Sequence, residues 1–444
     1  MTSRELALAV VRDVFPSRDA PQRGAHESFD YRASRSGLDA RDRAFAAELA
    51  YGAIRFRRYL DWLLAPYVGE RAGSLPPTIS EILRLGAYQL AKMAVEPHAA
   101  VSETVGLAKR HGHRGTAGIV NAVLRRLATQ QDRTPLREDF TSGDDFLGTL
   151  YSFPTWIVTL VRRVFDDALV EPILGGMNVP AQAALRVNLL RSTVEDAVEA
   201  LRARGAVVTQ SQLVPEVLLV AEAPQGFSLD DAEQRWDLQG EIAAVPVDVL
   251  APREEENGIE LCSGRGNKTL QILGRTRARG RLESIDNNRT RLARQRERLE
   301  KLGAGNVILR DADATAQVGA ADCDFALVDA PCSGLGILGR QPEARWRKDP
   351  RDPERLSEIQ DSLLAAAATR VRQGGRLVYS VCSFAPEETS QRIDTFLRAH
   401  ADFSRGILPE RYGPWLLPSG DLRIPPGIDR RDGFFVALLE RREG

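Results

Sequence analysis

The chain has 444 residues, of which 43% are hydrophobic and 27% charged, and its formal net charge is −1. These values are near the average of folded soluble domains and exclude a disordered or fibrous chain, while the length predicts two to three domains. No run approaches the ~20 apolar residues that a membrane span needs, and the N-terminus lacks the apolar core of a secretory signal. Four cysteines are too few for a disulfide framework, so we expect a soluble protein of the reducing cytoplasm.

The charge is unevenly distributed along the chain. Residues 1–130 contain 19 Lys and Arg against 13 Asp and Glu, so the remainder is acidic. Almost all the cations are arginines, which a GC-rich genome explains most simply. Arginine is also the better bidentate partner of phosphate, so the basic N-terminal third weakly indicates nucleic-acid binding.

Residues 1–130 are predicted to be helical, because apolar residues recur at helical spacing without an alternating strand pattern. The first clear face starts just after the Pro76–Pro77 break. The apolar positions of this face and of two later faces are Ile79, Ile82, Leu83, Gly86 and Leu90, then Val101, Val105 and Ala108, then Val120, Val123, Leu124 and Leu127. The polar stretch 129–145 is predicted to be a linker.

A mixed segment follows, with a helix near 154–165 and strands at 183–190 and 216–222. From about residue 236, short apolar strands alternate with helical stretches, which predicts a parallel sheet wrapped by helices. The strands are 258–262, 281–285, 306–309, 324–328 and 376–381, with 434–440 last. We therefore expect an α plus α/β multidomain protein with domains 1–130, 131–235 and 236–444. Ligands bind such sheets at the carboxyl ends of the strands.

The first crossover, ELCSGRGNKTLQIL (260–273), passes from a strand through a glycine loop into a helix that starts near Lys268 and Thr269. Gly264 and Gly266 let the backbone approach a ligand, and the amides of a helix start attract polar groups. Many mono- and dinucleotide sites share this pattern, so alone it is a weak signal.

Three acidic residues follow the next two strands. Asp286 ends the second strand, where an acid accepts the ribose hydroxyls of a nucleoside cofactor or caps the following helix; both interpretations stay open. Asp311 and Asp313 follow the third strand, where such folds reach the adenine. Spacing leaves the choice open, though NVILRDADAT favours Asp313.

Two further segments contain more specific sequence motifs than the glycine loop. DAPCSGLG (329–336) places Asp329 and Cys332 after a buried strand, and YSVCSFAPEE (379–388) places Cys382 after the next one. Adjacent parallel strands lie ~4.8 Å apart, so we expect both cysteines and the aspartate to face one cleft. Buried apolar cysteines are the plain alternative, and a metal site is disfavoured because the chain has no Cys-x-x-Cys pair.

Covalent catalysis explains both thiols together with the acid. Carbon 5 of a pyrimidine is a poor nucleophile until a thiolate adds to carbon 6. An acid at nitrogen 3, a role that suits Asp329, offsets the developing charge. A second group is then needed for loss of the carbon-5 proton and elimination of the thiol.

The segments 329–347 and 374–388 resemble the RNA cytosine carbon-5 methyltransferases of the Fmu/Sun/NOL1/NOP2 type. The resemblance implies a Rossmann-like catalytic domain, S-adenosyl-L-methionine as cofactor and small-subunit (16S) rRNA as substrate. It implies that Cys382 attacks carbon 6, that Cys332 assists release and that Asp329 holds the ring. The N-terminal third is similar to the NusB-like RNA-binding domain of such enzymes, in the segments 47–55, 81–90, 99–109 and 118–127, and LRVNLL (185–190) fits their connecting subdomain.

By this resemblance the cofactor is held by the glycine loop and by acids after the strands, namely Cys262, Ser263, Gly264, Arg265, Gly266, Asn267, Lys268, Asp286, Asp311, Asp313 and Asp329. The loop departs from the family pattern Cys-Ala-Ala-Pro-Gly-Gly-Lys-Thr at Arg265 and Asn267. We expect Asn267 to tolerate a positive φ and Arg265 either to clash with the cofactor or to point outward.

Two further functions remain open. A non-catalytic RNA-binding or ribosome-assembly factor is compatible with the altered loop, although both cysteines, Asp329 and Lys268 are retained. A DNA cytosine methyltransferase is disfavoured by Cys382 and the NusB-like domain. For an RNA methyltransferase, as for an RNA-binding assembly factor, we expect the helical domain to contact RNA phosphates through Arg55, Arg57, Arg58, Arg125 and Arg126. We expect His111 and His113 to be exposed loop residues.

Overall fold

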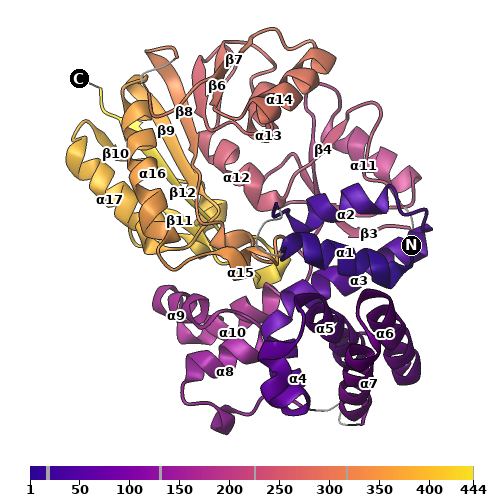
Figure 1. Cartoon of the computed structure of the whole chain (residues 1–444). Coiled ribbons are helices and arrows are strands. Elements are labelled where there is room, and N and C mark those ends of the chain that lie inside the picture. The colour runs from indigo at the N-terminus through magenta and orange to yellow at the C-terminus, as the bar shows by residue number, and fades with distance from the viewer. Residues whose placement is uncertain (17–20, 130–132, 225–226, 317–318, 444) are drawn as a thin grey trace. The chain divides into compact units, whose positions relative to one another are not determined.

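The computed structural model describes residues 1–16, 21–129, 133–224, 227–316 and 319–443. Its contacts divide the chain into two compact units, one of Met1–Asn178 with Gln341–Lys348 and one of Val179–Arg340 with Asp349–Gly444 (Figure 1). The division into domains at 130 and 235 stays a prediction. Residues 130–132 of the linker predicted at 129–145 lie outside the described residues. The last three residues of that stretch, 143–145, are not linker but the first turn of α8.

The first unit is built of helices. These are α1 (Ser3–Val14), α2 (Ala25–Ala33), α3 (Ala40–Arg55), α4 (Arg57–Val68), α5 (Pro77–Lys92), α6 (Pro97–His111), α7 (Arg114–Ala128), α8 (Gly143–Leu150), α9 (Thr155–Val164), α10 (Asp167–Gly176) and α15 (Ala344–Arg347), with 3-10 turns at Gly69–Ser74 and Arg137–Asp139. The predicted faces of α5, α6 and α7 supply much of one apolar core. At Gly86 of α5 a Cβ would lie 2.5 Å from Leu124 of α7, so close helix packing requires glycine there.

The segment 341–348 belongs to this helical unit although it lies between strands of the other unit in sequence. Arg345 is fully buried, with its guanidinium 3.8 Å from the Phe153 ring centroid and donating to Asn178 Oδ1 at 2.8 Å. Trp346 Nε1 donates to the Ile54 carbonyl at 2.6 Å. A short piece of chain thus completes the core of a unit to which its neighbours in sequence do not belong.

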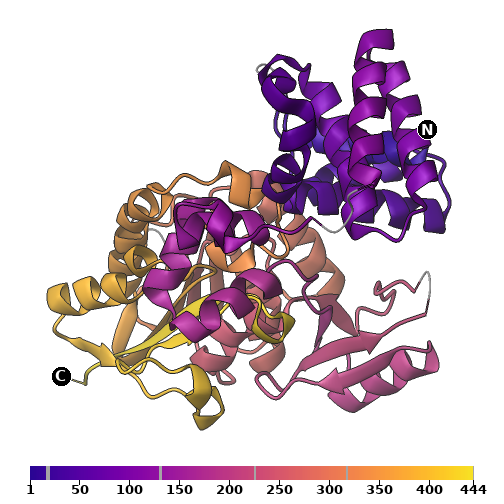
Figure 2. The same ribbon diagram turned by 90° about the horizontal axis from the view of Figure 1, so that it is seen from below.

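The second unit contains a small antiparallel sheet and a large mixed one. The small sheet has the order β2-β3-β1-β4, from β1 (Ala184–Val187), β2 (Val207–Gln210), β3 (Val217–Glu222) and β4 (Trp236–Leu238). Helix α11 (Val194–Ala203) lies beside this sheet in the pink part of Figure 2. Its Ala197 and Leu201 share an apolar core with the strands. The two strands predicted at 183–190 and 216–222 are present, and β2 and β4 are added.

The large sheet has the order β10-β12-β9-β8-β5-β6-β7, with β11 paired to β12. Its strands are β5 (Gly258–Leu261), β6 (Leu282–Asp286), β7 (Val307–Asp311), β8 (Cys323–Asp329), β9 (Val371–Val381), β10 (Phe403–Arg405), β11 (Leu422–Ile424) and β12 (Phe434–Arg441). The five strands from β5 to β9 are parallel, as predicted. The closing strand β12 is antiparallel to β9, a common way for a parallel sheet to end at one edge.

Helices cover both faces of this sheet. Along β8, Phe325 and Leu327 face the core that contains α12 (Glu241–Leu250), and Ala326 and Val328 face the core that contains α16 (Asp352–Ala368). The remaining helices are α13 (Asn267–Arg275), α14 (Arg289–Leu302) and α17 (Ser390–Ala399).

The strand order reverses between β5 and β8, since β6 lies on one side of β5 and β8 on the other. The loops that follow β5 and β8 therefore leave the same edge of the sheet side by side, which is where doubly wound folds bind ligands. None of the helices in the described ranges is long and apolar enough to cross a bilayer.

Candidate active site

The loop after β5 is held in an unusual backbone conformation. Cys262, Gly264 and Gly266 all have positive φ, at 62°, 59° and 79°. Asp286, at the end of β6, accepts hydrogen bonds from the Gly264 amide at 2.9 Å and the Asn288 amide at 2.8 Å. The helix-cap interpretation of Asp286 is wrong, because Asn288 caps α14. Asp286 instead braces the glycine loop.

The two residues that depart from the family pattern do not block the loop. Arg265 is exposed, and its carbonyl accepts from Arg298 at 2.9 Å. The Asn267 side chain also accepts from Arg298, at 2.7 Å, and Asn267 begins α13 without the positive φ we expected. The left-handed residue directly before α13 is Gly266, where a Cβ would lie 2.6 Å from the buried Gln295.

A cavity of 380 Å³ opens beside this loop. It is lined by Gln239, Ala243, Cys262, Ser263, Gly264, Arg265, Asn267, Lys268, Arg291, Asp329 and Pro331. Gln239 and Arg291 were not predicted. Gln239 precedes α12 and accepts a 2.8 Å hydrogen bond from Arg186, a contact between distant segments that leaves no local pattern.

The cavity suits a nucleoside cofactor that bears both charges of an amino acid. Its volume falls in the range of small-molecule sites, and it offers the cations Lys268 and Arg291 beside the carboxylate of Asp329. It lies at the N-terminus of α13, whose first amides attract anionic groups. These groups match the ammonium and carboxylate of S-adenosylmethionine.

Asp311 and Asp313 are placed differently. Asp311 is exposed and accepts from Arg289 at 2.6 Å. Asp313 is exposed and accepts from the amide of Thr315 at 2.9 Å, a bond that lowers the pKa of the carboxyl. Neither belongs to the described lining of the cavity. Their contact with the adenine stays a prediction.

Asp329, at the end of β8, contacts both the start of α13 and the adjacent strand β9. Lys268 Nζ lies 2.5 Å from Asp329 Oδ2, and Ser380 Oγ donates to Oδ1 at 2.9 Å. The register of the sheet places Asp329 directly opposite Ser380 of β9. The carboxylate is thus fixed on both oxygens at the cavity wall.

The two predicted thiols are in contact. Cys332 Sγ and Cys382 Sγ are 3.2 Å apart, in the turns that follow β8 and β9, and both residues are half-buried. The hydrogen bond to Cys382 and burial raise the pKa of the Cys332 thiol well above its usual range. The other two cysteines are elsewhere. Cys262 lines the cavity, where burial raises its pKa to about 12, and Cys323 is buried at the start of β8.

In the helical unit, the structure corrects the expected phosphate contacts. Arg55 is buried. Arg57 is paired with Glu81, and Arg58 donates to Asp145 and to the Phe153 carbonyl. These three arginines therefore stabilise the unit itself. Arg125 and Arg126 are exposed on α7. His111 and His113 are exposed as predicted, but His111 is the last residue of α6 and not a loop residue, and His113 caps α7.

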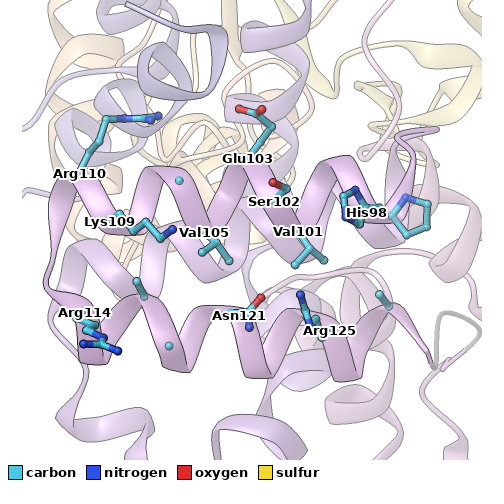
Figure 3. A pocket seen from close by; sticks show the side chains of 15 residues that line it. His98, Val101, Ser102, Glu103, Val105, Lys109, Arg110, Arg114, Asn121 and Arg125 are labelled. Atoms are coloured by element: carbon cyan, nitrogen blue, oxygen red, sulfur yellow. The ribbon is translucent and has the colours of Figure 1, made fainter.

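A second cavity, of 1150 Å³, lies between α6 and α7 of this unit. Figure 3 shows Val101, Val105 and Lys109 of α6 directed toward α7, and Asn121 and Arg125 of α7 directed toward α6. Its lining includes four cations, Lys109, Arg110, Arg114 and Arg125, against the single acid Glu103. Arg110 is paired with Glu5. The groove thus has an apolar floor and a basic rim.

Three protein-family models match successive parts of the chain. The model of the 16S rRNA methyltransferase RsmB/F family matches residues 247–440, the NusB family model matches 1–129, and an RsmF/B-like ferredoxin-like domain matches 153–225. The crystal structure of PH0851 has the same fold, with a TM-score of 0.81 at 23% identity over 99% of each chain.

Two curated relatives extend over almost the whole chain. The "Probable ribosomal RNA small subunit methyltransferase B" of Synechocystis sp. (strain ATCC 27184 / PCC 6803 / Kazusa) is 32% identical over 99% of this chain and 100% of its own. The "Ribosomal RNA small subunit methyltransferase B" of Proteus mirabilis (strain HI4320) is 29% identical over 91% of this chain and 92% of its own. The resemblance drawn from the sequence is confirmed. The chain belongs to the ribosomal RNA small subunit methyltransferase B family, a family of S-adenosylmethionine-dependent methyltransferases, and carries that family's NusB-like helical domain.

Proposed function

We propose that this protein methylates carbon 5 of a cytosine in small-subunit (16S) rRNA through a covalent bond between Cys382 and carbon 6. The observation that carries the proposal is the pair of thiols 3.2 Å apart, in turns adjacent to the cavity wall formed by Asp329. Methylation of an exocyclic amino group needs no thiol, whereas activation of carbon 5 needs one nucleophilic sulfur and a group that assists its release.

Cys382 is the nucleophile. Cys332 keeps its proton, because burial and the neighbouring sulfur raise its pKa, and directs that proton toward the Cys382 sulfur. As the Cys382 thiolate adds to carbon 6, a proton shared between Asp329 and Lys268 moves to nitrogen 3, and electron density shifts to carbon 5. S-adenosylmethionine, when bound, supplies an electrophilic methyl group. Asp329 then takes back the proton from nitrogen 3.

Cys332 completes the reaction. It transfers its proton to the departing sulfur of Cys382 and accepts the proton that carbon 5 loses. The electrons of the carbon 5–hydrogen bond restore the ring double bond, and the carbon 6–sulfur bond breaks. Cys332 ends as it began, and the base leaves as 5-methylcytosine. Cys382, which attacked as a thiolate, ends as a thiol and loses its proton to solvent before the next turnover.

The helical unit contributes contacts to RNA phosphates. Arg125 and Arg126 are exposed on α7, and Lys109, Arg114 and Arg125 rim the groove between α6 and α7. Cations arranged along a groove neutralise successive phosphates without reading sequence. The target cytosine must be unstacked, which favours a loop or an opened segment of the rRNA.

The test is methyl transfer from labelled S-adenosylmethionine to unmodified small-subunit rRNA, with the labelled base identified afterwards. We expect label in 5-methylcytosine for the wild type and for Cys323→Ala, whose thiol is buried at the other end of β8. Cys382→Ala should give no product. No transfer by the wild type, with RNA still bound, would favour the assembly-factor function instead.

Detection of the covalent protein–RNA intermediate in two variants distinguishes the roles of the two cysteines. Cys332→Ala should accumulate a protein–RNA adduct that survives denaturant, because addition proceeds and release does not. Cys382→Ala should form none. An adduct through Cys332 in the Cys382→Ala protein would reverse the assignment.

A further inference from the structure

A buried carboxylate lies behind the two thiols. Glu388 ends the 3-10 turn Pro386–Glu388, six residues after Cys382, and its relative exposure is 0%. Its backbone carbonyl accepts from the Tyr379 hydroxyl at 2.8 Å, which fixes the residue against β9. It does not line either cavity described above, and the mechanism gives it no proton to transfer.

The contacts of this carboxylate join three segments. Oε1 accepts from the Ser333 amide at 2.7 Å and from Gln360 Nε2 of α16 at 3.2 Å. Oε2 accepts from the Ser383 hydroxyl at 2.5 Å and also from the Ser333 hydroxyl. Ser333 directly follows Cys332, and Ser383 directly follows Cys382. One carboxylate therefore holds the residue after each reactive cysteine.

The turn of Cys332 is fixed on both sides of the thiol. Gln360 Nε2 also donates to the Pro331 carbonyl at 3.0 Å, so the residue before Cys332 is tied to the same group as the residue after it. On the other turn, the Gly336 amide donates to the Cys382 carbonyl at 2.9 Å. With their flanking residues fixed, the two cysteines have little freedom to separate.

Only a carboxylate satisfies this set of partners. The Ser333 amide and the Gln360 amide are obligatory donors, and both hydroxyls donate as well. Two carboxylate oxygens accept all four, whereas an amide side chain has one acceptor oxygen and presents donors to the rest. Burial raises the pKa of the Glu388 carboxyl, and the hydrogen bonds from Ser333, Ser383 and Gln360 oppose that rise by stabilising the charged form.

We propose that Glu388 is a positioning residue, whose buried carboxylate ties the turn after Cys332 to the turn after Cys382 and so sets the distance between the two thiols. The proposal adds to the proposed function a residue that touches neither RNA nor cofactor. It rests on that function only in its activity readout.

The first measurement needs neither RNA nor methyl donor. Diamide oxidises two neighbouring thiols to a disulfide and is itself reduced to a hydrazine, and the rate depends on how often the sulfurs meet. We expect the wild type to form the Cys332–Cys382 disulfide, detected by mass spectrometry of the linked peptides. In Glu388→Gln this rate should fall by about tenfold or more, since proximity raises effective concentration. Ser383→Ala should give a smaller fall.

The control is Glu283→Gln. Glu283 is also fully buried in this unit, but its carboxylate bonds to Arg310 and to the Ala320 amide, at a distance in sequence from both thiol turns. It should lower the Tm without changing the disulfide rate. A Glu388→Gln protein that forms the disulfide as fast as the wild type, or faster, overturns the proposal and leaves Glu388 a structural residue.

The second measurement is methyl transfer. Glu388→Gln should lower kcat by about tenfold or more while the KM for S-adenosylmethionine stays within about twofold, because thiol placement affects bond formation and not cofactor binding. A rise in KM with unchanged kcat would overturn the positioning role. If the wild type itself transfers no methyl group, the proposed function fails, and the disulfide rates still decide the role of Glu388.

Discussion

Glu260 in β5 is a carboxyl group with only 1% of its surface exposed, beneath the loop that begins at Cys262. Its Oε2 accepts from Thr269 at 2.5 Å and from Ser284 at 3.1 Å. Burial raises the pKa of Glu260 to about 7. The folded protein therefore holds this proton more tightly than the unfolded chain does.

This burial predicts a pH-dependent stability. The unfolded carboxyl has its ordinary pKa of 4.5, so native Glu260 contributes stability below that pH and loses it as pH rises to 7. The loss amounts to roughly 3 kcal/mol. Glu260→Gln carries no such proton, so its Tm relative to wild type should rise between pH 5 and pH 8. Glu358→Gln, at an exposed position of α16, should follow the wild type. Parallel Tm curves for Glu260→Gln and wild type would contradict the prediction.

Single residues differed in how far sequence could predict them. The contact of Cys332 with Cys382 was predictable, because their motifs end adjacent parallel strands. Glu388 and Gln239 were not, since their partners come from distant segments and no local spacing marks a buried acceptor or a cavity wall. Arg57 and Arg58 were misjudged for the same reason, because their partners Glu81 and Asp145 lie 24 and 87 residues away.

At the scale of elements, we compare two glycines that lie at the ends of helices flanking the large sheet. Gly266 precedes α13 at φ +79° and Gly303 follows α14 at φ +70°. An alanine in this left-handed region costs about 1 kcal/mol or slightly more at either place. At Gly303 its Cβ meets nothing within 4 Å, whereas at Gly266 it would displace Gln295. Gln295 in turn accepts a hydrogen bond from Ser263 of the glycine loop after β5 at 3.1 Å.

The two alanine variants should therefore differ in function. Gly266→Ala should weaken S-adenosylmethionine binding by about tenfold or more, since it adds a buried clash to the backbone cost. Gly303→Ala should lower the Tm by a few degrees and bind the cofactor as the wild type does. Calorimetric titration with S-adenosylmethionine measures both. Equal affinities for the two variants would show that Gln295 does not hold the loop.

Helices and strands could be predicted from the sequence where a local pattern of residues determines them. The parallel strands were predictable from short apolar runs between helices, and the helical faces from their spacing. The antiparallel direction of β12 was not, because it depends on how the chain returns through α17, β10 and β11. Short strands such as β4, three residues long, carry too few residues for a period to appear.

At the scale of the whole molecule, the proposed function predicts a strong effect of salt on RNA affinity. Each phosphate neutralised contributes about 0.7 to the slope of log affinity against log salt for single strands. The double variant Arg125→Gln/Arg126→Gln should reduce that slope by about 1, measured by filter binding of small-subunit rRNA. Arg57→Gln, whose guanidinium is paired with Glu81, should lower the Tm and keep the slope. An unchanged slope in the double variant would remove these arginines from the RNA contact.

The position of the segment 341–348 has a consequence for the order in which the protein is made. Most of the helical unit precedes the second unit in the chain, yet Arg345 and Trp346, which contact its residues, are synthesised 167 and 168 residues after Asn178. During synthesis the helical unit is therefore incomplete until the eight strands β1 to β8 of the second unit have been made. Those pieces follow Cys332 within fifteen residues. The core of the helical unit can therefore be completed only after the turn that carries Cys332 has been synthesised.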